Sequence, residues 1–241
     1  MKVISMPNEV FLTFDIDWAS DPVLNATIDM LEELDVGGTF LATHKTPSLE
    51  KIRYNEQMEL GIHPNFNNVL MGHESKSYHQ IIDEFLEIAP DATCERAHAL
   101  TQNSLISFEL KRRGLIYDLN TYIPLSSNIL FQPYYAPSGL LTVPFFFEDD
   151  IYFFYEPSRL PLEEYFAFDG IKVFNFHPIH VFLNTDSRAL YEQAKTISDD
   201  PMKLKELKNT KFYGVADFLM DVIDFGKKRL FKFKTIKQIA R

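Results

Sequence analysis

The chain has 241 residues, enough for a domain with a substantial core, and 46% of them are hydrophobic, including 22 Phe and 11 Tyr. This composition excludes a disordered chain, and the single cysteine, Cys94, excludes an internal disulfide or a cysteine-based zinc cluster. Seven of the 24 basic residues lie in 227–241, a segment without acidic residues. The rest of the chain therefore contains 17 basic and 34 acidic residues. Such an acidic body excludes an extended nucleic-acid surface.

Apolar runs alternate with amphipathic segments along the chain, which predicts an α/β fold. We expect strands at 10–15, 39–43, 60–63, 92–98, 115–120, 140–147 and 171–176. We expect helices from Asp21 to the glycines at 37 and 38, then at 50–59, 78–88, 105–113, 191–197, 204–208 and 215–225. Residues 121–138, rich in Pro, Ser and Tyr, predict a long loop that borders a site.

The pattern predicts one domain over residues 1–241, in which the basic segment 227–241 packs on the body through its apolar residues. No glycine-rich phosphate loop follows a strand, so an irregular barrel of about seven parallel strands fits better than a nucleotide-binding fold. The sequence contains no membrane span and no signal-peptide core, so we expect a cytoplasmic protein.

Ionisable residues follow the carboxyl ends of the expected strands. They are Asp15, Asp17, His63, Arg96, His98, Asp149, Asp150, His177 and His180. Because the carboxyl ends of parallel strands lie on one face of an α/β protein, we expect these side chains to meet there.

Asp15 and Asp17 lie two apart in an extended segment, so their carboxylates emerge on the same side. Two like charges at this distance need a cation beside them, which a metal ion, a histidine or an arginine can supply. His63 and Asn67 lie four apart and face the same way if the chain turns helically between them. With Asp17 they would hold one metal ion and leave positions open for water.

Four motifs occur in a characteristic order: Thr13-Phe14-Asp15-Ile16-Asp17, His63-x-x-x-Asn67, Arg96, and Phe174-Asn175-Phe176-His177. Together they resemble the motif series of the polysaccharide deacetylases, the NodB-like carbohydrate esterases, over about residues 10–180. The stretches 61–66 and 175–180 look most like the WbmS-like branch, which is associated with surface-polysaccharide gene clusters. The resemblance implies a distorted (β/α) barrel of about seven parallel strands.

The resemblance also implies a divalent metal, with zinc as the expected ion. Its ligands would be Asp17, His63 and Asn67, and Asn67 stands where the family usually has another histidine. An amide oxygen is a poorer zinc ligand than an imidazole. His98 could be an additional ligand, a substrate contact or a residue without a catalytic role.

The proton-transfer residues also follow from the resemblance. Asp15 would be the general base, Arg96 would keep its carboxylate charged, and His177 would be the general acid. Either Asp150 or Asp149 could orient His177 by accepting a hydrogen bond from its ring. His180 is either an accessory residue or a structural partner of its neighbours.

These roles predict a metal-dependent hydrolase that removes N-acetyl groups from an amino sugar, in a small molecule or an oligosaccharide of surface-glycan biosynthesis. Aromatic residues in the 121–138 loop could stack on a sugar or pack in the core; they are Tyr122, Phe131, Tyr134 and Tyr135. Two alternatives stay open: an amidohydrolase of a small non-peptide C–N bond, and a degenerate member that binds carbohydrate without turnover, which Asn67 suggests. Retention of Asp15 and His177 argues against the second alternative.

Overall fold

The computed structural model of the protein describes residues 8–127, 129, 131–154 and 160–239. The strands are β1 (Glu9–Asp15), β2 (Gly38–Ala42), β3 (Met58–Ile62), β4 (Cys94–Glu95), β5 (Tyr117–Asp118), β6 (Tyr134–Tyr135), β7 (Leu141–Thr142), β8 (Phe147–Glu148), β9 (Lys172–Phe176) and β10 (Lys232–Lys234). The helices are α1 (Asp21–Glu33), α2 (Ser48–Tyr54), α3 (Asn67–Leu70), α4 (Tyr78–Ile88), α5 (Ser104–Arg112), α6 (Asp149–Phe154), α7 (Leu162–Ala167), α8 (Pro178–Leu183), α9 (Arg188–Lys195), α10 (Pro201–Glu206) and α11 (Val215–Lys228). Short 3-10 turns are η1 (His98–Leu100), η2 (Leu125–Ser127) and η3 (Ile236–Gln238).

The strands form one sheet in the order β6-β7-β5-β4-β3-β2-β1-β9-β8, and β10 pairs with β1. Within the described part of the chain, only the pairing of β6 with β7 is antiparallel. The run 141–148 connects the two sides of the sheet, because its first part (β7) pairs with β5 and its last part (β8) pairs with β9. A bridge between Tyr122 and Phe145 continues the contact with the β5 side.

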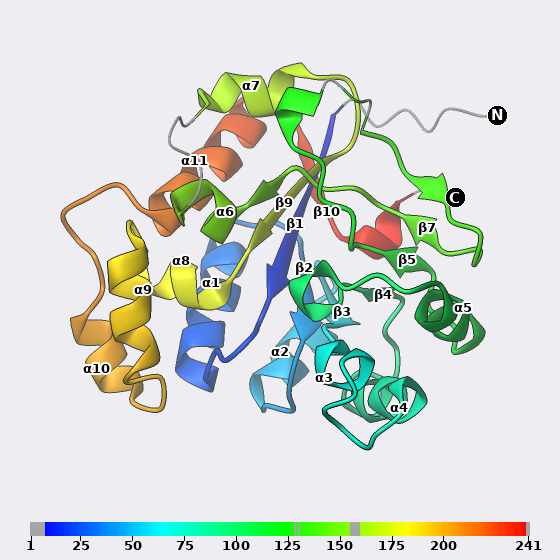
Figure 1. Cartoon of the computed structure of the whole chain (residues 1–241). Helices are drawn as coiled ribbons and strands as arrows, with labels where there is room; N and C mark the ends of the chain where they lie inside the picture. The colour runs from blue at the N-terminus through cyan, green and yellow to red at the C-terminus, as the bar shows by residue number, and fades with distance from the viewer. Residues whose placement is uncertain (1–7, 128, 130, 155–159, 240–241) are drawn as a thin grey trace.

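The sheet therefore curls into a distorted (β/α) barrel, which confirms the expected fold (Figure 1). The expected strand at 140–147 is present as two short ladders, β7 and β8, because each part faces a different neighbour. With this run counted as one, the described residues form a ring of seven parallel strands, in agreement with the expected number of about seven, and β6 and β10 are additions to it.

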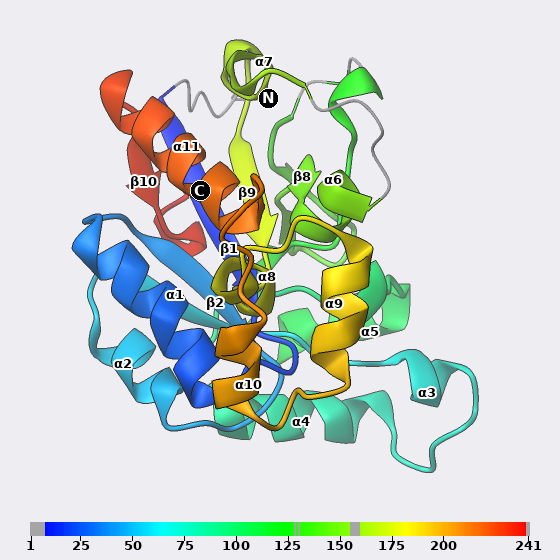
Figure 2. The same ribbon diagram turned by 90° about the vertical axis from the view of Figure 1, so that its left-hand side faces the viewer.

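Strands β2, β1 and β9 are consecutive neighbours in the sheet. They are buried along almost their whole length, as expected for parallel strands that are covered on both faces. Phe14 of β1 stacks between Phe40 of β2 and Phe176 of β9, at ring-centroid distances of 4.8 and 6.0 Å. Helices cover the outside of the sheet (Figures 1 and 2). The buried face of α1 shows why it is a helix, since Leu24, Ile28 and Leu31 recur at helical spacing.

The basic C-terminal segment lies against the amino end of the barrel. Residues of β10 pair with Glu9–Phe11 of β1. Beyond it, the backbone N–H of Ile236 donates to Thr39 Oγ1 (3.0 Å), and that of Lys237 donates to Glu59 Oε2 (2.8 Å). These bonds close the end of the barrel opposite the carboxyl ends of the strands. Residues 240–241 of the segment lie outside the described residues.

Several element boundaries differ from the prediction, and two of them have a clear physical reason. The helix expected at 50–59 ends at Tyr54, because Asn55 leaves helical geometry (φ −93°, ψ 117°) and the chain enters β3 at Met58. The strand expected at 92–98 is only Cys94–Glu95, since the chain then leaves the sheet and turns at η1. Among the described residues, no helix combines the length and apolarity needed to cross a membrane.

Candidate active site

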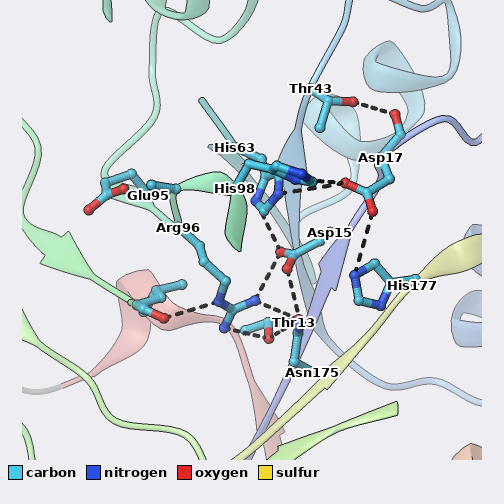
Figure 3. Close-up of polar contacts among 12 residues, drawn as sticks. Thr13, Asp15, Asp17, Thr43, His63, Glu95, Arg96, His98, Asn175 and His177 are labelled. Carbon is cyan, nitrogen blue, oxygen red and sulfur yellow. Dashed lines mark hydrogen bonds and ion pairs between the residues drawn. The ribbon is translucent and has the colours of Figure 1, made fainter. Parts of the chain in front are cut away.

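Asp15 ends β1 and is buried at the carboxyl end of the barrel. Its Oδ1 lies 2.9 Å from Arg96 Nη1, and its Oδ2 accepts a hydrogen bond from Asn175 Nδ2 at 3.0 Å. Arg96 is itself held by two further hydrogen bonds. Its Nη2 donates to Thr13 Oγ1 (3.1 Å), and its Nε donates to the carbonyl oxygen of Leu119 (3.0 Å). Figure 3 shows the guanidinium between these partners. The carboxylate and the guanidinium therefore fix each other in one geometry.

The pKa of Asp15 reflects two opposed effects. Burial on its own raises it, but the charge of Arg96, with smaller contributions from His63 and His177 and the bond from Asn175, lowers it to about 2. Asp15 is therefore a carboxylate over the whole neutral range, as the predicted role of Arg96 requires.

Asp17 lies just beyond the end of β1 in the left-handed region, with φ of 39°. A non-glycine residue held in this region is unusual and often marks a functional site. Its carbonyl oxygen accepts a hydrogen bond from Thr43 Oγ1 at 2.5 Å, which holds the turn. This conformation aims the carboxylate into the pocket (Figure 3).

Three imidazoles face the Asp17 carboxylate at distances longer than a hydrogen bond. His63 Nε2 lies 3.6 Å from Oδ1, His98 Nδ1 lies 3.9 Å from Oδ1, and His177 Nε2 lies 3.6 Å from Oδ2. Donor atoms of Asp17, His63 and His98 all lie within 4.8 Å of one another. One carboxylate and two imidazoles are a donor set suited to a divalent metal, and they leave further coordination positions open.

The state of His63 also fits a metal ligand. Burial lowers its pKa, although the charges of Asp15 and Asp17 oppose this effect, so the ring is neutral at pH 7. A neutral imidazole has a free lone pair for a metal. Its Nδ1 is buried, has no hydrogen-bond partner among the described residues, and lies 3.6 Å from Asp15 Oδ1.

Asn67, the third ligand expected from the sequence, has a different contact. It begins α3, and its Oδ1 accepts a hydrogen bond from Thr101 Oγ1 at 2.5 Å. Asn67 is not among the described residues that line the pocket, whereas His98 is. Of the three roles left open for His98, its position beside Asp17 favours that of a ligand.

His177 precedes α8 and is oriented by Asp149 rather than Asp150. Asp149 Oδ1 lies 2.7 Å from His177 Nδ1, and Oδ2 accepts the hydrogen bond of the His177 backbone N–H at 2.8 Å. Burial on its own lowers the pKa of His177, but the charge and hydrogen bond of Asp149, together with Asp17 and Asp15, raise it well above its usual range. The ring is therefore a cation that can donate a proton.

A pocket of about 300 Å³ opens over these residues. This volume is at the lower end of the range for small-molecule sites, so it suits roughly one sugar residue. The β8–α6 junction lines it with Glu148 and Asp150, and α9 lines it with Tyr191. Burial and the neighbouring Asp150 raise the pKa of Glu148 to about 8, so this carboxyl is mainly neutral at pH 7.

Comparisons with known proteins identify the family. A model of the WbmS-like polysaccharide deacetylases matches residues 12–195. The chain belongs to this family. Its structure is similar to the crystal structure of a Bordetella bronchiseptica protein, WbmS, assigned as a polysaccharide deacetylase involved in O-antigen biosynthesis, with a TM-score of 0.83, 38% identity and 92% of each chain covered. A comparison with curated proteins found no match.

More distant deacetylases share the fold. The structure assigned as a polysaccharide deacetylase from Mycobacterium smegmatis has a TM-score of 0.52 at 16% identity, covering 100% of this chain and 99% of that one. The polysaccharide deacetylase Bc1974 from Bacillus cereus has a TM-score of 0.50 at 12% identity, covering 97% and 94%. At these identities the likeness concerns the barrel alone.

His180 lies behind the site of this WbmS-like deacetylase. It is buried, its Nδ1 lies 3.1 Å from Thr185 Oγ1, and its ring packs 5.5 Å from that of His177 and 4.5 Å from that of Tyr191. Burial and the nearby His177 lower its pKa well below its usual range. These contacts are those of a neutral packing residue.

The four aromatic residues of the 121–138 segment, for which sugar stacking and core packing were both left open, do not line the pocket. Tyr122 packs edge-on against Phe145, Phe131 is buried, and Tyr134 and Tyr135 are exposed on β6. Within the described part of the chain, the aromatic residues that line the pocket are instead Phe154 and Tyr191.

Thr13, Asn175 and Glu148 were not predicted as site residues, although each contacts or lines the site. A signal for the first two was present. Thr13 precedes Asp15 by two residues and Asn175 precedes His177 by two, so each shares a strand face with a chosen residue. A buried polar residue within an apolar strand needs a partner, and here the partners are Arg96 and Asp15.

Proposed function

We propose that this WbmS-like protein is a metal-dependent deacetylase that hydrolyses the N-acetyl group of an amino sugar in surface-glycan biosynthesis. One observation carries the proposal: a charged carboxylate, Asp15, and a cationic imidazole, His177, flank the donor set around Asp17 in a single pocket. Amide hydrolysis needs a base for the attacking water and an acid for the departing nitrogen, and this arrangement supplies both.

The metal would be held by Asp17, His63 and His98, with zinc as the expected ion because two of the three donors are imidazoles. When bound, it would lower the pKa of a water ligand, which a base as weak as Asp15 requires, and would polarise the substrate carbonyl. In this proposal His98, and not the predicted Asn67, is the third metal ligand.

The protein groups would move the protons. Asp15 accepts a proton from the attacking water as the water oxygen forms a bond to the carbonyl carbon. Arg96 and Asn175 keep the Asp15 carboxylate in place. His177 Nε2 points toward Asp17 and the pocket, so it donates a proton to the nitrogen as the C–N bond breaks. Acetate and a free amine are the products, and Asp149 keeps the proton on His177 Nδ1.

The surface-glycan substrate is supported by the 38% identity with the Bordetella bronchiseptica protein, which is assigned to O-antigen biosynthesis. The pocket volume of about 300 Å³ suits a single N-acetylated sugar, free or at the end of a short oligosaccharide.

The proposal is tested by measuring acetate release from a panel of N-acetylated sugars, nucleotide sugars and oligosaccharides. We expect release from at least one member, loss of activity with a chelator and recovery with Zn²⁺. Metal analysis should give about one divalent ion per chain, as expected for a single catalytic site. Metal-independent activity would contradict the proposed chemistry, and no release from any member would favour the amidohydrolase or carbohydrate-binding alternatives.

A further inference from the structure

The imidazole of His98 reaches the site from a short turn that has little packing of its own. The His98 side chain is 47% exposed, compared with 4% for His63. A half-exposed side chain keeps much of its rotamer freedom, so binding a metal would cost it conformational entropy. Its backbone must therefore be held in position by other groups.

The turn also contains two consecutive residues with unfavourable backbone geometry. Ala99 and Leu100 have φ angles of 55° and 52°, in the left-handed region that non-glycine residues rarely adopt. Such conformations are energetically unfavourable and persist only where the surroundings impose them. The hydrogen bonds at the two ends of the turn can impose this backbone conformation.

Those bonds connect the turn to the segment that carries His63. The backbone N–H of His98 donates to the carbonyl oxygen of Pro64 at 2.9 Å. At the other end, Thr101 Oγ1 lies 2.5 Å from Asn67 Oδ1 and 3.0 Å from the carbonyl oxygen of His98. Thr101 is therefore within reach of both the His98 backbone and Asn67.

We propose that Asn67 and Thr101 are positioning residues, which hold the turn so that His98 supplies the second imidazole of the metal site. The inference rests on the proposed metal-dependent function and concerns how the ligand set is assembled. It gives Asn67 a role at a position where the resemblance implies a histidine. The imidazole comes from residue 98, and residue 67 fixes the turn that carries it.

The first experiment measures Zn²⁺ affinity by competition with a chromophoric chelator. We expect Thr101→Val and Asn67→Ala each to weaken Zn²⁺ binding by roughly tenfold or more, the usual effect of losing a group that orients a metal ligand. The double variant should bind Zn²⁺ no more weakly than the weaker of the two single variants, because both substitutions remove the same hydrogen bond between Thr101 and Asn67. Thr101→Ser, which keeps the hydroxyl, should retain most of the affinity.

Asn68→Ala is the matched control, because Asn68 is the exposed neighbour of Asn67 in α3. It should leave Zn²⁺ affinity unchanged. Thermal unfolding of each metal-free variant separates a change in affinity from a loss of folding. Unchanged affinity in both Thr101→Val and Asn67→Ala, or fully additive losses in the double variant, would overturn the proposal.

The second experiment uses the visible absorption spectrum of the Co²⁺-substituted protein, which responds to the ligands directly. His98→Gln should change the Co²⁺ spectrum strongly, and Thr101→Val should change it in the same direction but less. An unchanged spectrum in His98→Gln, with metal binding lost in Asp17→Ala and His63→Ala, would refute the positioning role while leaving metal-dependent function intact. Unchanged binding in all three would refute the metal site itself.

Discussion

Asp149 holds His177 at two points, by Oδ1 on the ring nitrogen Nδ1 and by Oδ2 on the backbone N–H of the same residue. This paired contact fixes both the position of the histidine and the proton on Nδ1. The other nitrogen, Nε2, is consequently directed at the pocket. A carboxylate that supports a histidine in this way also stabilises its cationic form, which is the form a general acid needs.

The pH dependence of activity should follow from this contact. The pKa of His177 is raised mainly by Asp149, so Asp149→Asn should lower it. Because the acid must be protonated, activity is lost as the pH rises through its pKa, and the alkaline limb of the kcat profile should move to lower pH in the variant. Asp150→Asn should leave this limb in place, since the carboxylate that pairs with the ring nitrogen Nδ1 is that of Asp149. An alkaline limb at the same pH in Asp149→Asn and in the unaltered protein would contradict the role of Asp149 in raising the pKa of His177.

Substitution of Asp15 should separate catalysis from metal binding. Asp15→Asn keeps the shape of the side chain and removes the base, so we expect kcat to fall by roughly 10²–10⁴-fold. Metal content should be unaffected. His63→Ala should instead reduce the metal content, and the two measurements together decide whether the roles have been exchanged.

Removal of the guanidinium should destabilise the protein and change its response to acid. Arg96→Met leaves Asp15 buried without a counter-ion, which should lower the free energy of unfolding by about 3–5 kcal/mol. In the unaltered protein the pKa of Asp15 lies near 2, below its usual value of 3.8, so this group stabilises the fold above pH 4 and loses that contribution as the pH falls towards 2.

In Arg96→Met, burial is no longer opposed by Arg96, and the pKa of Asp15 should rise. Urea unfolding of the metal-free proteins across this pH range checks both effects. A variant with unchanged stability and unchanged acid sensitivity would show that Arg96 does not control Asp15.

The pocket wall formed by α9 should determine substrate affinity. Tyr191 lines the pocket and is stacked near Trp18 and Phe154, at centroid distances of 6.1 and 5.8 Å. Loss of a sugar–aromatic contact worth about 1 kcal/mol should raise KM roughly fivefold with little change in kcat. We therefore expect this result for Tyr191→Leu. Tyr134→Leu, on exposed β6, is the control that should leave KM unchanged.

The ends of the long strands could be predicted because hydrophobic patterning marks them. Asp15 ends β1, Asp17 lies just beyond it, and His63 and His177 directly follow β3 and β9. The structure brings these residues together, as the parallel arrangement requires. The choice between Asp149 and Asp150 could not be made in this way. It depends on where β8 gives way to α6, and neighbouring residues at such a junction point in different directions.

The sequence left the role of His98 open, and the proposed preference for His98 over Asn67 as a ligand could not be derived from its pattern, because the position of His98 depends on a turn in which non-glycine residues adopt positive φ. The α9 wall was missed for another reason. Its residues follow no strand, and they reach the pocket only because α9 lies beside α8 (Figure 2). Contacts of this kind come from tertiary packing and leave no local periodicity.

The pairing of β10 with β1 has a consequence for how the protein comes to be folded. Lys234 meets Glu9 across a separation of 225 positions, so the strand that carries Asp15 is synthesised early and completed late. Contacts this distant in sequence slow folding, and strand edges that wait for a partner are prone to aggregation. During translation, the amino end of β1 gains its pairing with β10 only after residues 232–234 have emerged from the ribosome.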